Sequence, residues 1–497
     1  MKANPVARSL VVALSLSLLA GCGDGTGSSP TTTTAPVATP LSAANLNLVF
    51  VVSPDLAYSA PGDVSPSTAN LTNQGLQRSL LMATYLREQV LGASNVTAIY
   101  ALAPMTHLQT ANRYPDMAAL ETIQQFALLD QMTLSTGPGT PSYTGNSYPI
   151  NASYVPGSIP AGVATPSLSL PCPGCAGLDF ADTAGNNGAL LTRLVTAKTP
   201  GFHVFSAPWE TTAALLAEVN RVEGLGLTVP TTYAGPNRVY AISIPASGSA
   251  RLVTYNGDLN PPSTYPALPS PMAGVSCPGP TTTPSLFRIT ATGGVDGVVI
   301  PPGINRNQTL YLLRHADAHP TAYYADGNYV GAGQWRALAL PDALRGKISP
   351  DQVYSTDPSQ VTPGTVSPSG DHSWSNVAPS LTVQPYAIAN NLPYHLVTNS
   401  LINDKNSPQL TSDFFFTGGT FSDHAVLLGW QYVQAPQIIR ALLASYSYGG
   451  TPVPDWSPTD YDSVWTVKID AEGNLSVDNT TCEGIDSTRL PVTAPQF

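Results

Sequence analysis

The chain has 497 residues, which is enough for two or more domains that each bury a full hydrophobic core. Charged residues make up only 10% of it, and the formal net charge is −11. Because an acidic chain without a basic run lacks the electrostatic footprint of a nucleic-acid-binding protein, no nucleic-acid partner is expected. The 41 glycines and 48 prolines predict long ordered loops rather than a collagen-like repeat.

The chain begins with the pattern of an export signal. A basic start is followed by an apolar run over residues 10–19, which is too short to span a bilayer. The run leads into the sequence L-A-G-C, which ends at Cys22 and resembles the lipobox of bacterial lipoproteins. An ordinary secretory signal with a chance cysteine is the alternative.

The lipobox resemblance implies that residues 1–22 hold a lipoprotein signal peptide, cut before Cys22 so that its thiol carries diacylglycerol. It implies Gram-negative export and contact with the membrane through the lipid anchor only. Gly23 after the cysteine permits sorting to the outer membrane, facing the periplasm or the surface. Residues 23–44 are rich in Gly, Ser, Thr and Pro and predict a flexible tether.

The next segment, residues 45–260, has the alternating strands and helices of an α/β domain. An apolar strand over residues 48–52 leads into the sequence S-P-D at residues 53–55. A helix is predicted over residues 73–92, because apolar side chains recur there near helical spacing. Residues 134–190 are rich in Pro, Gly, Ser and Thr and predict a loop-like insertion.

A proline-rich linker with added strands, residues 261–304, follows this domain. Eight prolines lie between residues 259 and 285, and residues 286–300 predict an added pair of strands. A second α/β domain is predicted over residues 305–485, and residues 486–497 form a tail.

Four cysteines remain when Cys22 is set aside, and an even number in an exported chain predicts two disulfides. Cys172 with Cys175 and Cys277 with Cys482 is one of three possible pairings, and the other two stay open. A redox pair would need a helix start beside a βαβ unit, and a zinc site would need more nearby ligands. No metal or cofactor is therefore expected.

The second domain opens with an apolar run over residues 310–313 that ends in Arg314, His315 and Ala316. A buried strand that opens into a loop delivers side chains to the edge of a sheet where α/β proteins bind ligands. An imidazole there can attack phosphorus, and a guanidinium beside it can hold phosphate oxygens through a bidentate fork. A chance Arg-His pair at a strand end is the alternative.

The sequence around this pair resembles the R-H-G signature of the histidine phosphatase (phosphoglycerate mutase-like) superfamily, in particular an exported bacterial lipoprotein branch. Further segments resemble the family's first helix, second strand, R-P-x-x-T-x-x-P stretch, W-Q-H strand and last strand, in this order: residues 333–338, 353–358, 379–385, 425–432 and 460–465. The resemblance implies an α/β fold, a three-layer α/β/α sandwich with a mixed sheet. It also implies that the ligand is phosphate or a phosphorylated small molecule.

The resemblance assigns roles to the residues that match its motifs. His315 is the nucleophile that accepts the phosphoryl group, and Arg314 clamps the phosphate. Asp317 could orient the loop, shuttle a proton or cap the loop. Tyr432 stands at the place of the family's second histidine and keeps a hydrogen-bond donor without a positive charge, while Ala378 replaces the second arginine.

Two other polar side chains near these motifs are weaker candidates. Arg336 follows the start of the first helix and is expected to be an exposed cation. His424 precedes the strand over residues 425–430 and should lie at the opposite end of the sheet from His315.

The first half resembles a decayed copy of the second, and a tandem duplication is predicted. Residues 48–55 align with residues 310–317 at an offset of 262, with V-S in place of the Arg-His pair. Residues 108–111 resemble the family's R-x-x-Q-T-A helix, and the Trp209-Glu210 pair resembles Trp430-Gln431. Because the aligned positions are apolar or hydroxylic, no catalysis is expected in the first half.

Two functions remain open. The first is an envelope-anchored phosphomonoester hydrolase, similar to acid phosphatases, that forms a phosphohistidine in the C-terminal domain. The second is a catalytically degenerate lipoprotein that binds phosphate or a partner. The residues do not specify the substrate or the oligomeric state.

Overall fold

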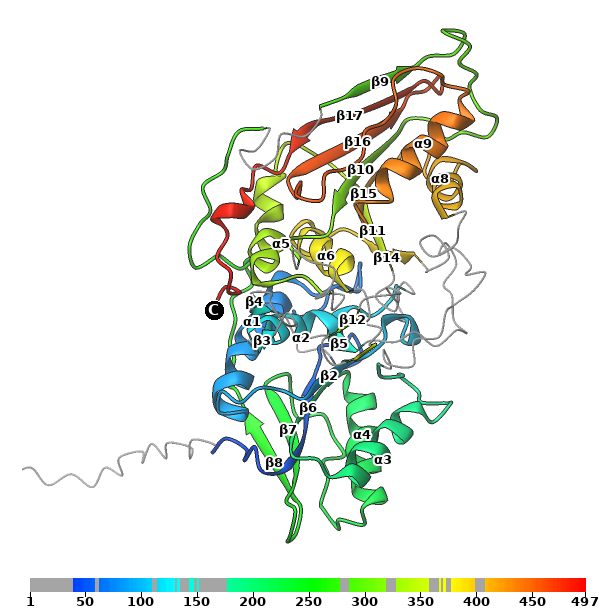
Figure 1. Cartoon of the computed structure of the whole chain (residues 1–497). Coiled ribbons are helices and arrows are strands. Elements are labelled where there is room, and N and C mark those ends of the chain that lie inside the picture. Colours follow the sequence, from blue (N-terminus) through cyan, green and yellow to red (C-terminus); the bar gives the residue numbers. More distant parts are fainter. Residues whose placement is uncertain are drawn as a thin grey trace, which may run out of the picture. The chain divides into compact units, whose positions relative to one another are not determined.

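The computed structural model is a mixed α/β protein with one mixed β-sheet in each half of the chain (Figure 1). Residues 38–497 form one compact unit. The structure describes residues 39–58, 62–109, 114–129, 132–134, 143–146, 150–151, 177–277, 286–318, 328–356, 366–367, 370–371, 377–397 and 407–497. The predicted signal peptide and lipobox, Cys172 and Cys175 lie outside these residues. No helix in the described ranges is both long and apolar enough to span a membrane.

The sheet of the first half, called the N-terminal sheet, has the strand order β5-β2-β6-β1-β7-β8. Its first four strands along the chain are parallel, and β7 and β8 are antiparallel. The strands are β1 (Leu46–Val52), β2 (Ala98–Ala101), β5 (Ile150–Asn151), β6 (Gly201–Ala207), β7 (Arg238–Ile244) and β8 (Arg251–Asn256).

The sheet of the second half, called the C-terminal sheet, has the strand order β14-β11-β15-β10-β16-β17-β9. Strands β10, β11, β14 and β15 are parallel, and the last three in the order are antiparallel. The strands are β9 (Arg288–Ala291), β10 (Gln308–Arg314), β11 (Gln352–Thr356), β14 (Tyr394–Val397), β15 (Ala425–Trp430), β16 (Ser463–Ile469) and β17 (Leu475–Cys482).

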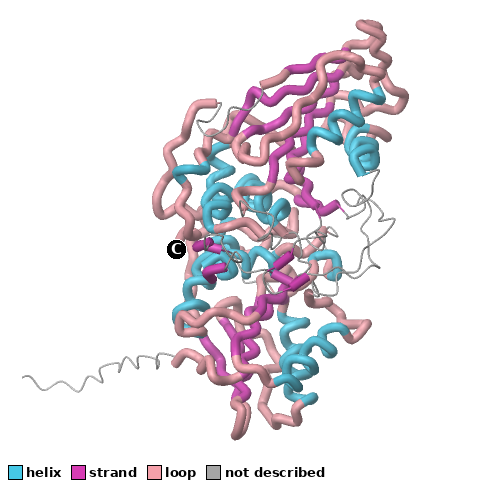
Figure 2. Tube along the Cα trace, in the orientation of Figure 1, coloured by secondary structure: helices cyan, strands magenta, loops and turns pink. Residues whose placement is uncertain are grey.

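Helices lie on both sides of each sheet (Figure 2). They are α1 (Asn73–Tyr85), α2 (Ala118–Leu129), α3 (Asn186–Ala197), α4 (Trp209–Val222), α5 (Gly331–Ala343), α6 (Ala378–Asn390), α8 (Ser407–Phe416) and α9 (Ala435–Ser445). Short elements complete the described chain: a π-helical turn at Leu86–Val90, 3₁₀ turns at Pro104–Thr106 and Ser487–Arg489, and strands β3 (Met132–Leu134), β4 (Tyr143–Asn146), β12 (Val366–Ser367) and β13 (Gly370–Asp371).

The central strands are apolar on both faces because each face packs against a helix layer. In β1, Val49 and Val51 join the core of α1 and α2, whereas Leu48 and Phe50 join the core of α3 and α4. Strand β10 is arranged in the same way between the α5–α6 layer and the α8–α9 layer. Because these parallel strands are covered by helices on both faces, their sequences are continuous apolar runs.

The two sheets share one topology. When the strands of each sheet are numbered by their order along the chain, with β9 left aside, both sheets have the strand order 3-2-4-1-5-6. Strand β9 is an additional edge strand of the C-terminal sheet. Strands β1 and β10 begin and end at positions separated by the same offset of 262. Their antiparallel neighbours, β7 and β16, end in equivalent register, with Leu46 opposite Ile244 and Gln308 opposite Ile469.

Two details of the predicted strands were wrong. Residues 286–300 form one strand, β9, because the chain turns through positive-φ residues Gly294, Asp296 and Gly297 instead of returning as a second strand. The segment at residues 460–465 leads into β16, which is not the last strand; β17 follows it with a largely polar sequence.

The helix expected near residues 108–111 is absent at residues 108–109, and residues 110–111 lie outside the described residues. Leu108 forms an isolated antiparallel bridge with Pro115, and the next described helix, α2, begins at Ala118. The Trp209–Trp430 equivalence is also out of register. Strand β1 ends opposite Ala207 and β10 ends opposite Trp430, so Trp209 lies two residues beyond the equivalent position, at the start of α4.

A disulfide joins Cys277 in the linker to Cys482 at the end of β17, with the two Cα atoms 5.6 Å apart. Such a separation lies within the ordinary range for a disulfide. The bond connects the segment before β9 to the end of β17.

Candidate functional site

The candidate site lies at the rim of the C-terminal sheet, which we define as the edge where its parallel strands reach their carboxyl ends. Strand β10 ends at Arg314, opposite Trp430 at the end of β15. The next residue, His315, donates its backbone N–H to the carbonyl of Trp430 over 3.2 Å. The backbone of the Arg-His pair is therefore fixed by the sheet, while the side chains emerge at its rim.

The loop after His315 is tied to the start of α6. The Ala316 N–H donates to the Thr382 hydroxyl oxygen over 2.8 Å, and that hydroxyl donates to the Ala378 carbonyl over 2.7 Å. Ala378, at the place expected for a second arginine, is buried and is the first residue of α6. This end of α6 thus faces the site loop without supplying a charge at position 378.

The imidazole of His315 has a defined tautomer. Its Nδ1 lies 2.9 Å from the Ala316 carbonyl oxygen, which can only accept, so Nδ1 carries the proton. Burial, together with the charge of Arg314, lowers the pKa of His315 to about 3. At neutral pH the ring is therefore uncharged, and its Nε2 has a free lone pair.

The guanidinium of Arg314 is held between two aromatic rings. Its Cζ lies 4.1 Å from the ring centre of Tyr432 and 3.8 Å from that of Tyr461. One terminal nitrogen donates to the carbonyls of Ser457, Pro458 and Asp460 over 3.3, 2.9 and 3.2 Å. Nε has no hydrogen-bond partner within the described part of the chain. Burial lowers the pKa of Arg314, but a guanidinium remains charged in proteins.

The two tyrosines also flank His315. The His315 ring contacts both tyrosine rings edge-on. Its centre lies 6.3 Å from that of Tyr432 and 6.1 Å from that of Tyr461. Tyr432, predicted as a site residue, therefore lies at the site and covers the Arg314 cation. Tyr461 was missed by the sequence analysis, although it lies inside the matched segment at residues 460–465.

Asp317 points into a buried ion-pair network. Its Oδ2 lies 2.5 Å from Nε of Arg336, whose Nη1 lies 2.5 Å from Glu483 and 3.8 Å from Asp462. Arg336 is 1% exposed, so the prediction of an exposed helix cation was wrong. Burial raises the pKa of Glu483 to about 8, although Arg336 acts in the opposite direction. Asp317 and Arg336 thus form an ion pair with each other, and this pair helps to hold the loop after His315 in place.

The histidines outside the pair lie elsewhere. His424 precedes β15, and its Nδ1 lies 3.0 Å from Asp351 at the opposite end of the sheet from Arg314, as expected. His395 belongs to β14 and stacks on Tyr354 with ring centres 4.7 Å apart. His319 and His372 fall outside the described residues.

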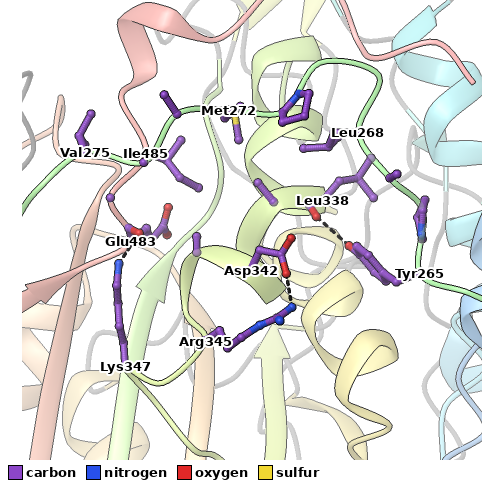
Figure 3. Close-up of a pocket in the computed structure, with 18 residues that line it drawn as sticks. Tyr265, Leu268, Met272, Val275, Leu338, Asp342, Arg345, Lys347, Glu483 and Ile485 are labelled. Carbon is purple, nitrogen blue, oxygen red and sulfur yellow. Dashed lines mark hydrogen bonds and ion pairs between the residues drawn. The ribbon is translucent and has the colours of Figure 1, made fainter.

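A separate cavity of about 510 Å³ lies beside α5, between the linker and the end of β17 (Figure 3). Tyr265 donates to the Leu338 carbonyl over 2.9 Å at one side, and Lys347 donates to the Glu483 carbonyl over 2.6 Å at the other. Neither Arg314 nor His315 lines this cavity, so it is distinct from the rim.

No protein-family model matches this sequence. No curated protein matches it either. Three solved structures are similar to about a third of the chain. A protein assigned as the phosphohistidine phosphatase SixA of Agrobacterium tumefaciens has 17% identity and a TM-score of 0.20, with 33% of this chain and 91% of that one covered.

A mycobacterial glucosyl-3-phosphoglycerate phosphatase has 12% identity and a TM-score of 0.22, with coverages of 35% and 97%. The protein YhfR of Bacillus stearothermophilus has 12% identity and a TM-score of 0.19, with coverages of 36% and 98%. Likeness at these TM-scores does not determine the family or the activity of this chain.

Proposed function

We propose that the C-terminal half is a slow phosphomonoester hydrolase of the histidine phosphatase type, with Nε2 of His315 as the nucleophile. The observation that carries this proposal is the Nδ1 contact with the Ala316 carbonyl, which leaves an uncharged ring with its other nitrogen free. Activated nucleophiles of this kind need a lone pair and a fixed orientation. Both are provided for His315 by the strand end and the loop.

The reaction would proceed in two displacements at phosphorus. Nε2 of His315 forms a bond to phosphorus as the ester P–O bond breaks, and the leaving alkoxide or aryloxide departs and takes a proton from solvent. The proton stays on Nδ1, which donates it in a hydrogen bond to the Ala316 carbonyl, and this bond stabilises the positive charge of the phosphorylated ring. Water then attacks phosphorus, and the P–N bond breaks to release phosphate and the neutral imidazole.

Arg314 would hold the phosphoryl oxygens. The lack of further positive charge around it limits the rate of hydrolysis. Its guanidinium is positioned by three carbonyls and two aromatic rings, while Ala378 and Tyr432 add no positive charge. Loss of one preorganised donor costs about 3 kcal/mol of transition-state stabilisation. Asp317 is held by Arg336 and is a poor proton donor for a leaving alcohol. Aryl esters, whose leaving groups need no proton, should therefore react best.

A second candidate function is phosphate or partner binding without turnover. The contact of the Arg314 cation with the rings of both Tyr432 and Tyr461 favours it, because two aromatic rings hold one cation rigidly for binding. Binding that depends on Arg314, with no product formed, would distinguish it from hydrolysis.

We also propose that the two halves arose by tandem duplication, that the first half is a non-catalytic scaffold, and that Cys22 carries a lipid anchor. The shared strand order and the offset of 262 support the duplication. Helices α1 and α5 add support, because each has a glycine at its third position and a buried arginine at its sixth. The lipobox sequence supports the anchor.

The test compares turnover of p-nitrophenyl phosphate by the wild-type chain, His315→Ala and a matched control, His424→Ala. The control removes a histidine that pairs with Asp351 at the far end of β15. We expect slow turnover by the wild type and the control and none by His315→Ala. Equal rates in all three preparations would overturn the proposal.

A further inference from the structure

The rim of the N-terminal sheet carries a cluster of possible metal ligands, formed by Asp55, His107 and Asp116. Asp55 follows β1 at the position that aligns with Asp317, His107 follows β2, and Asp116 precedes α2. One donor atom from each residue lies within 4.8 Å of the donor atoms of the other two. Three loops that are distant in sequence thus bring two carboxylates and one imidazole to a single point.

Two of the three distances between these atoms are close to the edges of a small coordination shell. His107 Nδ1 lies 2.8 Å from Asp116 Oδ2 and 3.4 Å from Asp55 Oδ2. Ligands about 2.1 Å from a metal ion are about 3.0 to 3.4 Å apart in octahedral or tetrahedral geometry. The side chains therefore need only small adjustments to surround one ion.

Each of the three side chains is already held by a second contact. The other carboxylate oxygens, Oδ1 of Asp55 and Oδ1 of Asp116, accept from the backbone N–H groups of Ala57 and Ala118 over 2.6 and 3.0 Å. The His107 ring stacks on Phe180 with ring centres 3.8 Å apart and an angle of 7°. Contacts of this kind orient ligands in metal sites.

An independent observation indicates that the cluster holds more carboxylate groups than its one imidazole can balance. Asp55 is 2% exposed, and its Oδ2, which faces the cluster, accepts no hydrogen bond from the described residues. Asp116 is fully buried, and Glu210 adds a further negative charge near Asp55 and His107. A buried carboxylate oxygen without a donor is costly, and one imidazole cannot neutralise two carboxylates.

We propose that Asp55, His107 and Asp116 bind one divalent transition-metal ion, of which Zn²⁺ is the representative. A nitrogen donor combined with two carboxylates suits Zn²⁺ or Mn²⁺, whereas Ca²⁺ and Mg²⁺ prefer oxygen ligands alone. The ion clamps the loops after β1 and β2 to the start of α2. The site is separate from the proposed phosphoryl chemistry, because His315 and Arg314 belong to the other sheet.

No metal was predicted from the sequence, because that prediction rested on the cysteines and the three ligands here follow no short spacing motif. The metal-ligand cluster is recognisable only in the folded structure, where the strand order brings the loops after β1 and β2 to the same rim.

The test uses the untagged full chain, stripped with a chelator and titrated with Zn²⁺ in a calorimeter and with Co²⁺ by visible absorption. We expect one ion per chain, and at least about tenfold weaker binding for Asp55→Asn and for Asp116→Asn. The matched control is Asp351→Asn, which alters an exposed Asp–His pair in the other half and should leave binding unchanged.

Circular dichroism of each variant separates loss of the site from loss of the fold. If a variant is misfolded, His107→Gln, which keeps a polar side chain of similar size, replaces it in the comparison. Absence of Zn²⁺ binding at about 100 µM, or equal binding by folded Asp55→Asn and wild type, would overturn the inference and leave the cluster as an ion pair. Unchanged p-nitrophenyl phosphate hydrolysis in the metal-free chain is expected, so failure here does not affect the proposed function.

Discussion

The rims of the two sheets differ far more than the sheets themselves. Both sheets have the same strand order, and β1 and β10 match residue for residue in their bounds. At the ends of these strands, however, one half carries Arg314 and His315 and the other carries Val52 and Ser53. The comparison teaches that the two halves share the apolar chemistry of their packing positions, while one rim is cationic and the other acidic.

The helices after β1 and β10 show which residues belong to the scaffold. Arg78 in α1 and Arg336 in α5 occupy the same helix position, and both are buried against a carboxylate, Asp63 or Asp317. Because the arginine and its ion pair recur in the half without the Arg-His pair, we assign Arg336 to folding rather than to phosphate binding.

Removing these two arginines should produce the largest change in stability. Arg336→Leu leaves Asp317 and Glu483 buried without their partner, and breaking a buried ion pair costs about 3–5 kcal/mol. Arg78→Leu should cost less, because Arg78 pairs with one carboxylate. Urea denaturation measures both, with Arg345→Leu in an exposed ion pair as the control. A larger loss for Arg78→Leu would contradict this ranking.

Restoring charge to the C-terminal rim should raise the hydrolysis rate. Tyr432→His, and more so Tyr432→His with Ala378→Arg, adds cations near the oxygens that Arg314 is proposed to hold. We expect an increase in kcat of up to about 100-fold for the double variant, since one such donor contributes 10²- to 10³-fold. Steady-state kinetics with p-nitrophenyl phosphate measures the change, and the effects need not add. A fall in kcat for both variants would show that the tyrosine itself supports turnover.

A buried histidine distinguishes the two sheets at one strand position. His203 in β6 lies opposite Leu48, where the equivalent residue of β15, opposite Leu310, is Val426. Burial lowers the pKa of His203 to about 4, and its Nδ1 has no partner among the described residues. Because the unfolded chain then binds the proton more readily, stability is lost as pH falls from about 6.5 towards 4.

His203→Val should therefore stabilise the protein increasingly as the pH falls. The gain should approach about 3 kcal/mol near pH 4, which follows from the difference between the folded and unfolded pKa values. Denaturation curves of the wild type and the variant at pH 7 and pH 4.5 measure it. A gain that does not depend on pH would mean that His203 titrates normally in the folded state.

The glycines at the third positions of α1 and α5 give a smaller, paired test. A Cβ on Gly75 would meet the Asp63 carbonyl oxygen at 2.2 Å, and one on Gly333 would meet the Asp317 carbonyl oxygen at 2.6 Å. Gly75→Ala and Gly333→Ala should each cost about 1–3 kcal/mol, because a backbone atom must shift. Thermal unfolding checks this, with Gly188→Ala in α3, where the nearest neighbour lies at 3.5 Å, as the control.

The sequence predicted what depends on local pattern. The apolar runs located β1 and β10, and the strand end located Arg314 and His315 at the rim. Polar residues whose partners are distant in sequence were not predictable. The burial of Arg336 depends on Glu483, and the metal-ligand cluster depends on the loop holding His107. Strand β17 was missed because its alternating, largely polar sequence lacks an apolar run.

The measurement that tests the central claim most directly is the mapping of phosphate onto the protein after incubation with a ³²P-labelled aryl phosphate and rapid quenching. The account predicts an acid-labile label on the peptide that contains His315, attached at Nε2, because Nδ1 is engaged by the Ala316 carbonyl. The label should be absent from His315→Ala and present in His424→Ala. No label in the wild type, or a label that persists in His315→Ala, would contradict the account.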